Sequence, residues 1–191
     1  MKKRTVKIIV FCFIVFAFLV GGYFLKQTMF QKKYHNEKPV RIVYELDDYI
    51  TIKNKLPLSD AIGKKYDGSL VEEGTESFIE FSIVNEDDDL ALFEIYLTRN
   101  HITPREIKEN YIKLYLTDEY DQPVIGFDKN RLPVYSDLPY LVDKPSSKLL
   151  YTDILDGHSS KKYRLRAWLS DSYSISSLPE TFQFEVGVKN H

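Results

Sequence analysis

Cysteine is nearly absent from this sequence. The single cysteine, Cys12, lies inside an uncharged apolar stretch, between Phe11 and Phe13. The chain beyond it has no thiol and forms no disulfide, and a lipid attachment is excluded because Cys12 is not at the end of the stretch. Any domain that follows must be stabilised by its core, to which 43% hydrophobic and 14% aromatic residues contribute.

Recognised catalytic and cofactor signatures are missing as well. The sequence has no Gly-x-Ser-x-Gly, no glycine-rich phosphate loop and no His-Glu-x-x-His. No histidine has a second histidine or a carboxylate at the helical spacing of a zinc site; the histidines are His35, His101, His158 and His191. We therefore predict no enzyme, no catalytic residue, no cofactor and no metal ligand. Carboxylates brought together only by folding leave a hydrolase as the least favoured alternative.

A basic surface is missing from most of the chain. Residues 1–25 hold four Lys and Arg side chains and no acid, which leaves 22 bases against 28 acids for the rest, a net charge of −6. Nucleic-acid phosphate requires a basic face, so we exclude nucleic acid as a partner.

Residues 8–25 are 18 consecutive residues without a charge. As a helix they are about 27 Å long at ~1.5 Å per residue, close to the ~30 Å hydrocarbon core of a bilayer, and Lys7 and Lys26 can extend into the headgroups at either end. We predict a transmembrane anchor or uncleaved signal over 8–25, preceded by a basic cytoplasmic head at 1–7. The protein is then a single-pass protein of the cell membrane with its N-terminus inside.

Two alternatives to this topology remain open. Small residues at Val20 and Gly22 allow a peptidase to cut before Tyr23, which would release the rest of the chain. The number of basic residues on the two sides of the stretch is also similar, so a cytosolic domain is the second alternative. In the favoured topology residues 26–39 are a linker and residues 40–191 are an extracytoplasmic domain.

The rest of the chain alternates apolar and polar residues in short segments, which is typical of strands with one buried face. We predict about eight strands; the clearest segments are 40–46, 78–84, 90–97, 111–117, 148–153, 162–169 and 181–188. The acidic turn 86–89 should join two of them in a hairpin, and a surface calcium site there is the alternative to a solvated turn. This spacing indicates a mainly β fold, an antiparallel β-sandwich with Greek-key or jelly-roll connections.

Helix is expected only in short pieces after residue 40. Ser59 or Asp60 can cap a single turn that ends at Gly63. The capping-box residues Thr103 and Glu106, with Pro104 between them, predict a short helix that ends near Asn110. Residues 123–147 are rich in proline, aspartate and serine and predict a long excursion with one short edge strand near residues 134–135.

The strand pattern at 78–97, the Tyr-Arg-Leu-Arg-Ala-Trp-Leu-Ser segment at 163–170 and the strand at 181–186 resemble exported Gram-positive β-sandwich proteins, loosely the camelysin/TasA-like group. The resemblance covers roughly residues 40–188 and implies a cell-surface or matrix protein, with fibre assembly in some members. Camelysin is described as a metalloprotease, but no His-Glu-x-x-His is present here, so the resemblance implies no protease residues.

One strand carries the candidate ligand face. Arg164, Arg166 and Trp168 alternate along residues 162–169, so two cations and an indole share a face of the sheet, either as a binding surface or as ordinary packing. We therefore predict a membrane-anchored cell-surface module with a structural or interaction role, and as the alternative a module that binds a glycan or peptide on this face or in the excursion at 123–147. Its partners are the membrane, through residues 8–25, and a cell-envelope polymer, another surface protein or a second copy of the chain.

Overall fold

The computed structural model describes residues 40–45, 47–54, 57–65 and 78–191. The head 1–7, the apolar stretch 8–25 and the linker 26–39 lie outside these residues, and so does the predicted transmembrane helix. Within the described part of the chain, no helix has both the length and the apolar character needed to cross a membrane.

The described residues form strands joined by loops, and their helices are single turns. The elements are β1 (Val40–Tyr44), β2 (Tyr49–Lys53), α2 (Asp60–Gly63), β3 (Phe78–Asn85), β4 (Ala91–Asn100), η1 (Glu109–Tyr111), β5 (Ile112–Asp118), η2 (Tyr135–Asp137), β6 (Ser147–Leu155), β7 (Ser159–Leu169) and β8 (Thr181–Asn190).

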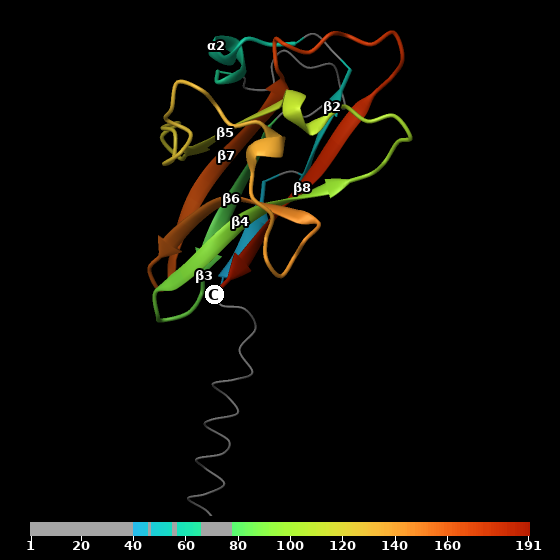
Figure 1. Ribbon diagram of the computed structural model, residues 1–191. Coiled ribbons are helices and arrows are strands. Elements are labelled where there is room, and N and C mark those ends of the chain that lie inside the picture. The colour runs from blue at the N-terminus through green and yellow to red at the C-terminus, as the bar shows by residue number, and fades with distance from the viewer. Residues whose placement is uncertain (1–39, 46, 55–56, 66–77) are drawn as a thin grey trace, which may run out of the picture. The chain divides into compact units, whose positions relative to one another are not determined.

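These strands make two four-stranded antiparallel sheets that pack face to face (Figure 1). Sheet A has the order β1-β3-β7-β5 and sheet B the order β2-β8-β4-β6. The prediction of a mainly β, antiparallel sandwich is confirmed, because alternation gives each strand one apolar face and two such faces bury each other.

The connections differ from the predicted ones. Consecutive strands alternate between the sheets, and no two consecutive strands pair among the described residues. The predicted hairpin over 78–97 is therefore wrong: β3 pairs with β1 and β7, whereas β4 pairs with β6 and β8. Greek keys and jelly rolls contain hairpin-connected strands, and the described strands include no such hairpin. The predicted Greek-key or jelly-roll connections are therefore not found among them. The turn at 86–90 carries the chain from one sheet to the other, which composition alone does not reveal.

The inward faces of both sheets form an aromatic-rich core. Phe81 stacks on Tyr163 with ring centroids 5.8 Å apart, and Tyr163 also meets Phe93 from the other sheet at 6.4 Å. Farther along, Tyr135 packs edge-on against Phe182 at 4.9 Å. Each fully buried phenylalanine stabilises the fold by about 1.5–3 kcal/mol, so these rings hold the sheets together without a disulfide.

The helix predicted at 103–110 is wrong. Residues 101–108 are a loop, and only the single 3₁₀ turn η1 follows. The Ile107 N–H donates to the Thr181 carbonyl, 3.1 Å away, and Glu106 forms a parallel bridge with Thr181. The Glu106 carboxylate accepts a hydrogen bond from Arg99, so it is not available to cap a helix.

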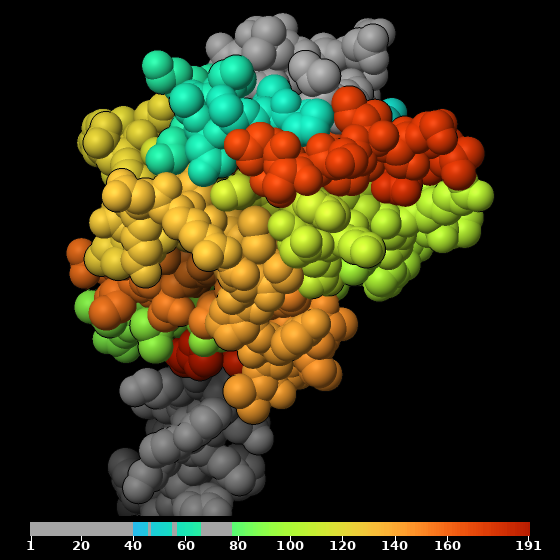
Figure 2. Space-filling view, turned by 45° about the horizontal axis from the view of Figure 1, so that its top comes forward, coloured from blue at the N-terminus to red at the C-terminus, as the bar shows by residue number. Residues whose placement is uncertain are grey.

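The excursion after β5 covers one side of the sandwich. It bridges β5 through Thr117–Pro123 and Lys113–Val134, and β6 through Tyr140–Lys148. The short edge strand predicted near residues 134–135 is wrong: Val134 makes one isolated bridge to β5, and the 3₁₀ turn η2 begins at Tyr135. Figure 2 shows segments 101–111 (lime) and 170–180 (red-orange) with α2 at one end of the domain, and segment 119–146 (yellow to orange) extending from that end along the side toward the other. The C-terminus and the β3–β4 turn lie at the other end (Figure 1).

Candidate functional site

The predicted ligand residues share the outer face of sheet A, but the fold covers one of them with α2. Trp168 is only 3% exposed. A Cβ added at Gly63 would lie 2.2 Å from Trp168 Cε2, so α2 rests directly on the indole ring. The indole Nε1 has no hydrogen-bond partner, which makes Trp168 a packing residue here rather than an accessible platform.

The two arginines of this face are engaged within the chain. The side chain of Arg166 is 2% exposed and donates to Asp121 Oδ1 at 2.7 Å and to Thr117 Oγ1 at 3.2 Å. Arg164 donates to Glu80 and lies 3.6 Å from Asp121. The ligand face stays a prediction, and only Arg164 keeps a substantial part of its side chain at the surface.

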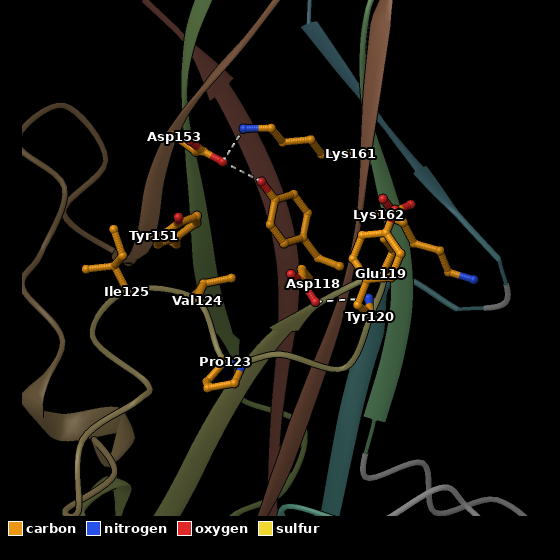
Figure 3. Close-up of a pocket in the computed structure, with 11 residues that line it drawn as sticks. Asp118, Glu119, Tyr120, Pro123, Val124, Ile125, Tyr151, Asp153, Lys161 and Lys162 are labelled. Carbon is orange, nitrogen blue, oxygen red and sulfur yellow. Dashed lines mark hydrogen bonds and ion pairs between the residues drawn. The ribbon is translucent and has the colours of Figure 1, made fainter.

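A cleft lies instead at the side of the sandwich, where β5 stops before β7 does. The β5–β7 ladder ends at the pair Asp118–Tyr163, whereas β7 starts four residues earlier, at Ser159. The cleft next to this step has a volume of about 320 Å³. It is lined by Asp118, Glu119, Tyr120, Pro123, Val124, Ile125, Tyr151, Asp153, Lys161, Lys162 and Tyr163 (Figure 3).

Two hydrogen bonds to Asp153 join the residues at the floor of the cleft. The Tyr163 hydroxyl donates to Asp153 Oδ2 at 2.9 Å, and Lys161 Nζ donates to the same oxygen at 2.7 Å (Figure 3). Burial and the bond to Asp153 raise the pKa of Tyr163. Burial also pushes the pKa of Asp153 upward, but bonds from Lys161, the Ile154 N–H and Tyr163 outweigh it and leave that pKa lowered. Asp153 is therefore an anion and Tyr163 a neutral phenol at neutral pH.

The rim of the cleft comes from the turn after β5. Asp118 Oδ1 accepts the backbone N–H groups of Tyr120 and Gln122, both at 2.9 Å, which closes the turn. Asp121 adopts the left-handed conformation there, with φ of 59°. The turn presents Tyr120, 75% exposed, and the chain that follows presents Ile125, 85% exposed. Two large amphipathic or apolar side chains at the mouth of a cleft are typical of a binding surface.

Acid–base catalysis is poorly supported by this geometry. A general acid needs a carboxyl whose pKa is raised, whereas Asp153 has a lowered pKa and a cation 2.7 Å away. The arrangement can hold a ligand by ring stacking, apolar contact and hydrogen bonds. The described residues contain no group of three or more His, Cys, Asp or Glu side chains placed to hold a metal ion. The acidic turn 86–89 is among the described residues and forms no such group either.

The histidines that are described lie apart from the cleft. Each lies beside one carboxylate: His101 Nδ1 is 2.8 Å from Glu106, His158 Nε2 is 2.7 Å from Asp88, and His191 Nε2 is 2.9 Å from Glu94. His35 lies outside the described residues. The sequence reasoning included part of the cleft, since residues 123–125 open the excursion at 123–147. It missed Tyr120, Tyr151 and Asp153, because three distant segments form the site and no local pattern links them.

No protein-family model matches this chain, and no curated protein matches it. The resemblance to exported Gram-positive β-sandwich proteins stays a prediction.

Proposed function

We propose that this chain is a single-pass, membrane-anchored module of the cell surface whose extracytoplasmic β-sandwich binds a partner without catalysing a reaction. The uncharged stretch 8–25, with its basic head, supports the anchor and the orientation. The cleft is the observation that carries the binding role. Polar groups held in place by hydrogen bonds at the floor lie below an exposed Tyr120–Ile125 mouth, whose surface gains from being covered.

A binding role is favoured over hydrolysis for a physical reason. Because the pKa of Asp153 is lowered and the pKa of Tyr163 is raised, Asp153 stays ionised and Tyr163 stays protonated near neutral pH. The partner is a cell-envelope polymer, another surface protein or a second copy of the chain. The alternative of a glycan ligand is supported by Tyr120, whose ring and hydroxyl can stack on a sugar and hydrogen-bond to it.

The topology is tested by adding a protease to intact cells that produce the full chain with a C-terminal epitope. We expect loss of the epitope without lysis, because the domain is outside. An epitope that survives until the cells are opened would place the domain in the cytosol and remove the proposal of a surface module.

The binding role is tested with matched isoleucine variants of the full chain in detergent micelles. Ile125 lies at the cleft, whereas Ile175 is an exposed isoleucine in the loop after β7. Co-sedimentation with cell-envelope fragments should fall in Ile125→Ser and stay unchanged in Ile175→Ser. Sedimentation velocity of the same samples reports self-association. Equal behaviour of the two variants in both measurements would remove the cleft as the binding surface.

A further inference from the structure

The two lysines that line the cleft are already neutralised within the chain. Lys161 Nζ donates to Asp153 at 2.7 Å and to the Ile154 carbonyl at 2.8 Å. Lys162 Nζ lies 2.6 Å from Glu45 and 3.2 Å from Glu80, neither of which lines the cleft. Neither cation is available to attract an anionic ligand.

The acids at the rim are less fully used. Asp118 Oδ1 accepts hydrogen bonds from two backbone N–H groups, and Asp118 Oδ2 has no partner among the described residues. Glu119 is exposed beside it and bonds to the Tyr120 hydroxyl. Residues 40–191 carry 18 Lys and Arg against 27 Asp and Glu, a net charge of −9. Both the local and the long-range field therefore favour a cationic ligand and oppose an anionic one.

The backbone of β7 offers an edge at the same place. The Ser170 N–H donates to the Tyr111 carbonyl, so the even-numbered residues of β7 direct their backbone groups toward β5. By this alternation Ser160 and Lys162 direct theirs to the side that β5 has left, because its last pair is Asp118–Tyr163. No described strand pairs with them on that side. The turn held by Asp118 Oδ1 takes the chain out of the ladder just before residue 119 would lie opposite Lys162.

We infer that the cleft is the docking site of an extended basic peptide segment of a partner protein. The segment adds as a short strand to β7 at Ser160–Lys162 and places a lysine or arginine side chain between Asp118 Oδ2 and the Tyr120 ring. Backbone pairing supplies affinity, and the ion pair with a cation–π contact supplies selectivity. The inference rests on the proposed binding function and names the ligand class of its cleft.

The test uses the full chain in detergent micelles and fluorescence anisotropy. The probe is a fluorescein-labelled peptide of alternating valine and threonine with one central lysine, compared with the same peptide carrying norleucine or glutamate there. We expect the lysine peptide to bind most tightly and the glutamate peptide least, with a difference that shrinks in high salt. Equal affinity of the lysine and norleucine peptides would overturn the inference.

Two further arms separate the contacts. Asp118→Asn keeps the Oδ1 acceptor for the turn and removes the charge, so it should weaken binding of the lysine peptide by about tenfold. Asp88→Asn removes an equal charge from the β3–β4 turn and should change little. N-methylation of the peptide backbone should abolish binding only at alternate positions. The inference fails if the two variants behave alike or if every N-methyl group has the same effect.

The inference and the proposed function fail in different ways. If no peptide binds but Ile125→Ser still co-sediments less with envelope fragments, the peptide assignment is wrong. The cleft then remains a binding surface, with a glycan as its ligand. If Ile125→Ser and Ile175→Ser are indistinguishable, the binding function itself fails.

Discussion

At the residue scale, glycine at position 63 is required by a neighbour rather than by its own backbone. The ring of Trp168 occupies the space that a side chain at Gly63 would fill, with Cε2 at 2.2 Å from the added Cβ. A short polar segment can therefore lie flat on the outer face of sheet A and bury the indole. This contact, and not a capping hydrogen bond, accounts for the glycine at the end of α2, since Ser59 makes no side-chain cap.

Gly63→Ala should destabilise the domain at 40–191 by about 1–3 kcal/mol, since overpacking a filled site displaces the ring or lifts the helix. The intrinsic helix preference of alanine opposes this by up to about 1 kcal/mol. Urea unfolding followed by the fluorescence of Trp168, the single tryptophan, measures the change. Ile62→Ala, at an exposed position of the same helix, should stay within about 0.5 kcal/mol of the parent. An unchanged Gly63→Ala variant would mean that α2 does not pack on the ring.

The lowered pKa of Glu80 predicts how the stability of the domain changes in acid. Burial raises the pKa of Glu80, but hydrogen bonds with Glu45, Arg164 and Lys162 outweigh it and lower the pKa to about 2. A lowered pKa in the folded state stabilises the fold above the unfolded-state pKa of about 4.3, and this stability is lost as the pH falls from there toward 2. Stability measured by urea unfolding should therefore decline over that interval.

Two variants isolate this contribution. Glu80→Gln should be less stable than the parent at pH 7 and should decline less below pH ~4.3, because it no longer takes up the proton. Arg164→Met removes one partner of Glu80 and should reduce the acid sensitivity in the same direction. If the three proteins have parallel stability profiles between pH 5 and 2, the ion pair contributes nothing to the acid response.

At the scale of the element, one side chain, that of Asn85, joins the β3–β4 turn to the β6–β7 turn. Asn85 is buried at the end of β3, and its Nδ2 donates to the carbonyls of Asp89, Leu155 and Asp156 at 2.8–3.3 Å. The His158 N–H adds a bond to the Asp87 carbonyl at 3.0 Å. The β3–β4 and β6–β7 turns therefore support each other, which explains how β3 and β4 can separate into two sheets.

Asn85→Ala should destabilise the domain by about 1–3 kcal/mol, because buried carbonyls lose their donor. Asn85→Asp should be at least as harmful at pH 7, since a carboxylate would face three carbonyl oxygens. The control is Asp89→Ala, because Asp89 contributes its backbone and has an exposed side chain. Thermal unfolding by circular dichroism ranks the variants. A harmless Asn85→Asp would show that the turns are held by something else.

At the scale of the whole molecule, every sheet pairing among the described strands joins strands that are not consecutive in chain order. The order is β1-β3-β7-β5 in one sheet and β2-β8-β4-β6 in the other. Each pairing must close a loop before any ladder forms, and the entropy of loop closure slows such folds.

The domain at 40–191 should consequently refold from urea on the scale of about milliseconds to seconds, with a further slow phase of about 10–100 s from proline isomers in the unfolded chain. Stopped-flow fluorescence of Trp168 measures both phases. A double-jump experiment, in which the chain is unfolded only briefly, should suppress the slow phase alone. Folding complete within microseconds would contradict a core assembled from distant strands.

The alternation of apolar and polar residues determined which segments are strands and which face of each is buried, because that signal has a period of two and is local. The basic head and the uncharged stretch 8–25 are likewise the basis of the predicted location in the cell membrane. Only the tertiary structure decided the partners of each strand, the burial of Arg166 and Trp168, and the cleft between Asp118, Tyr151 and Tyr163. Those features depend on contacts between residues far apart in the chain, and a local period contains no information about which distant face will cover which.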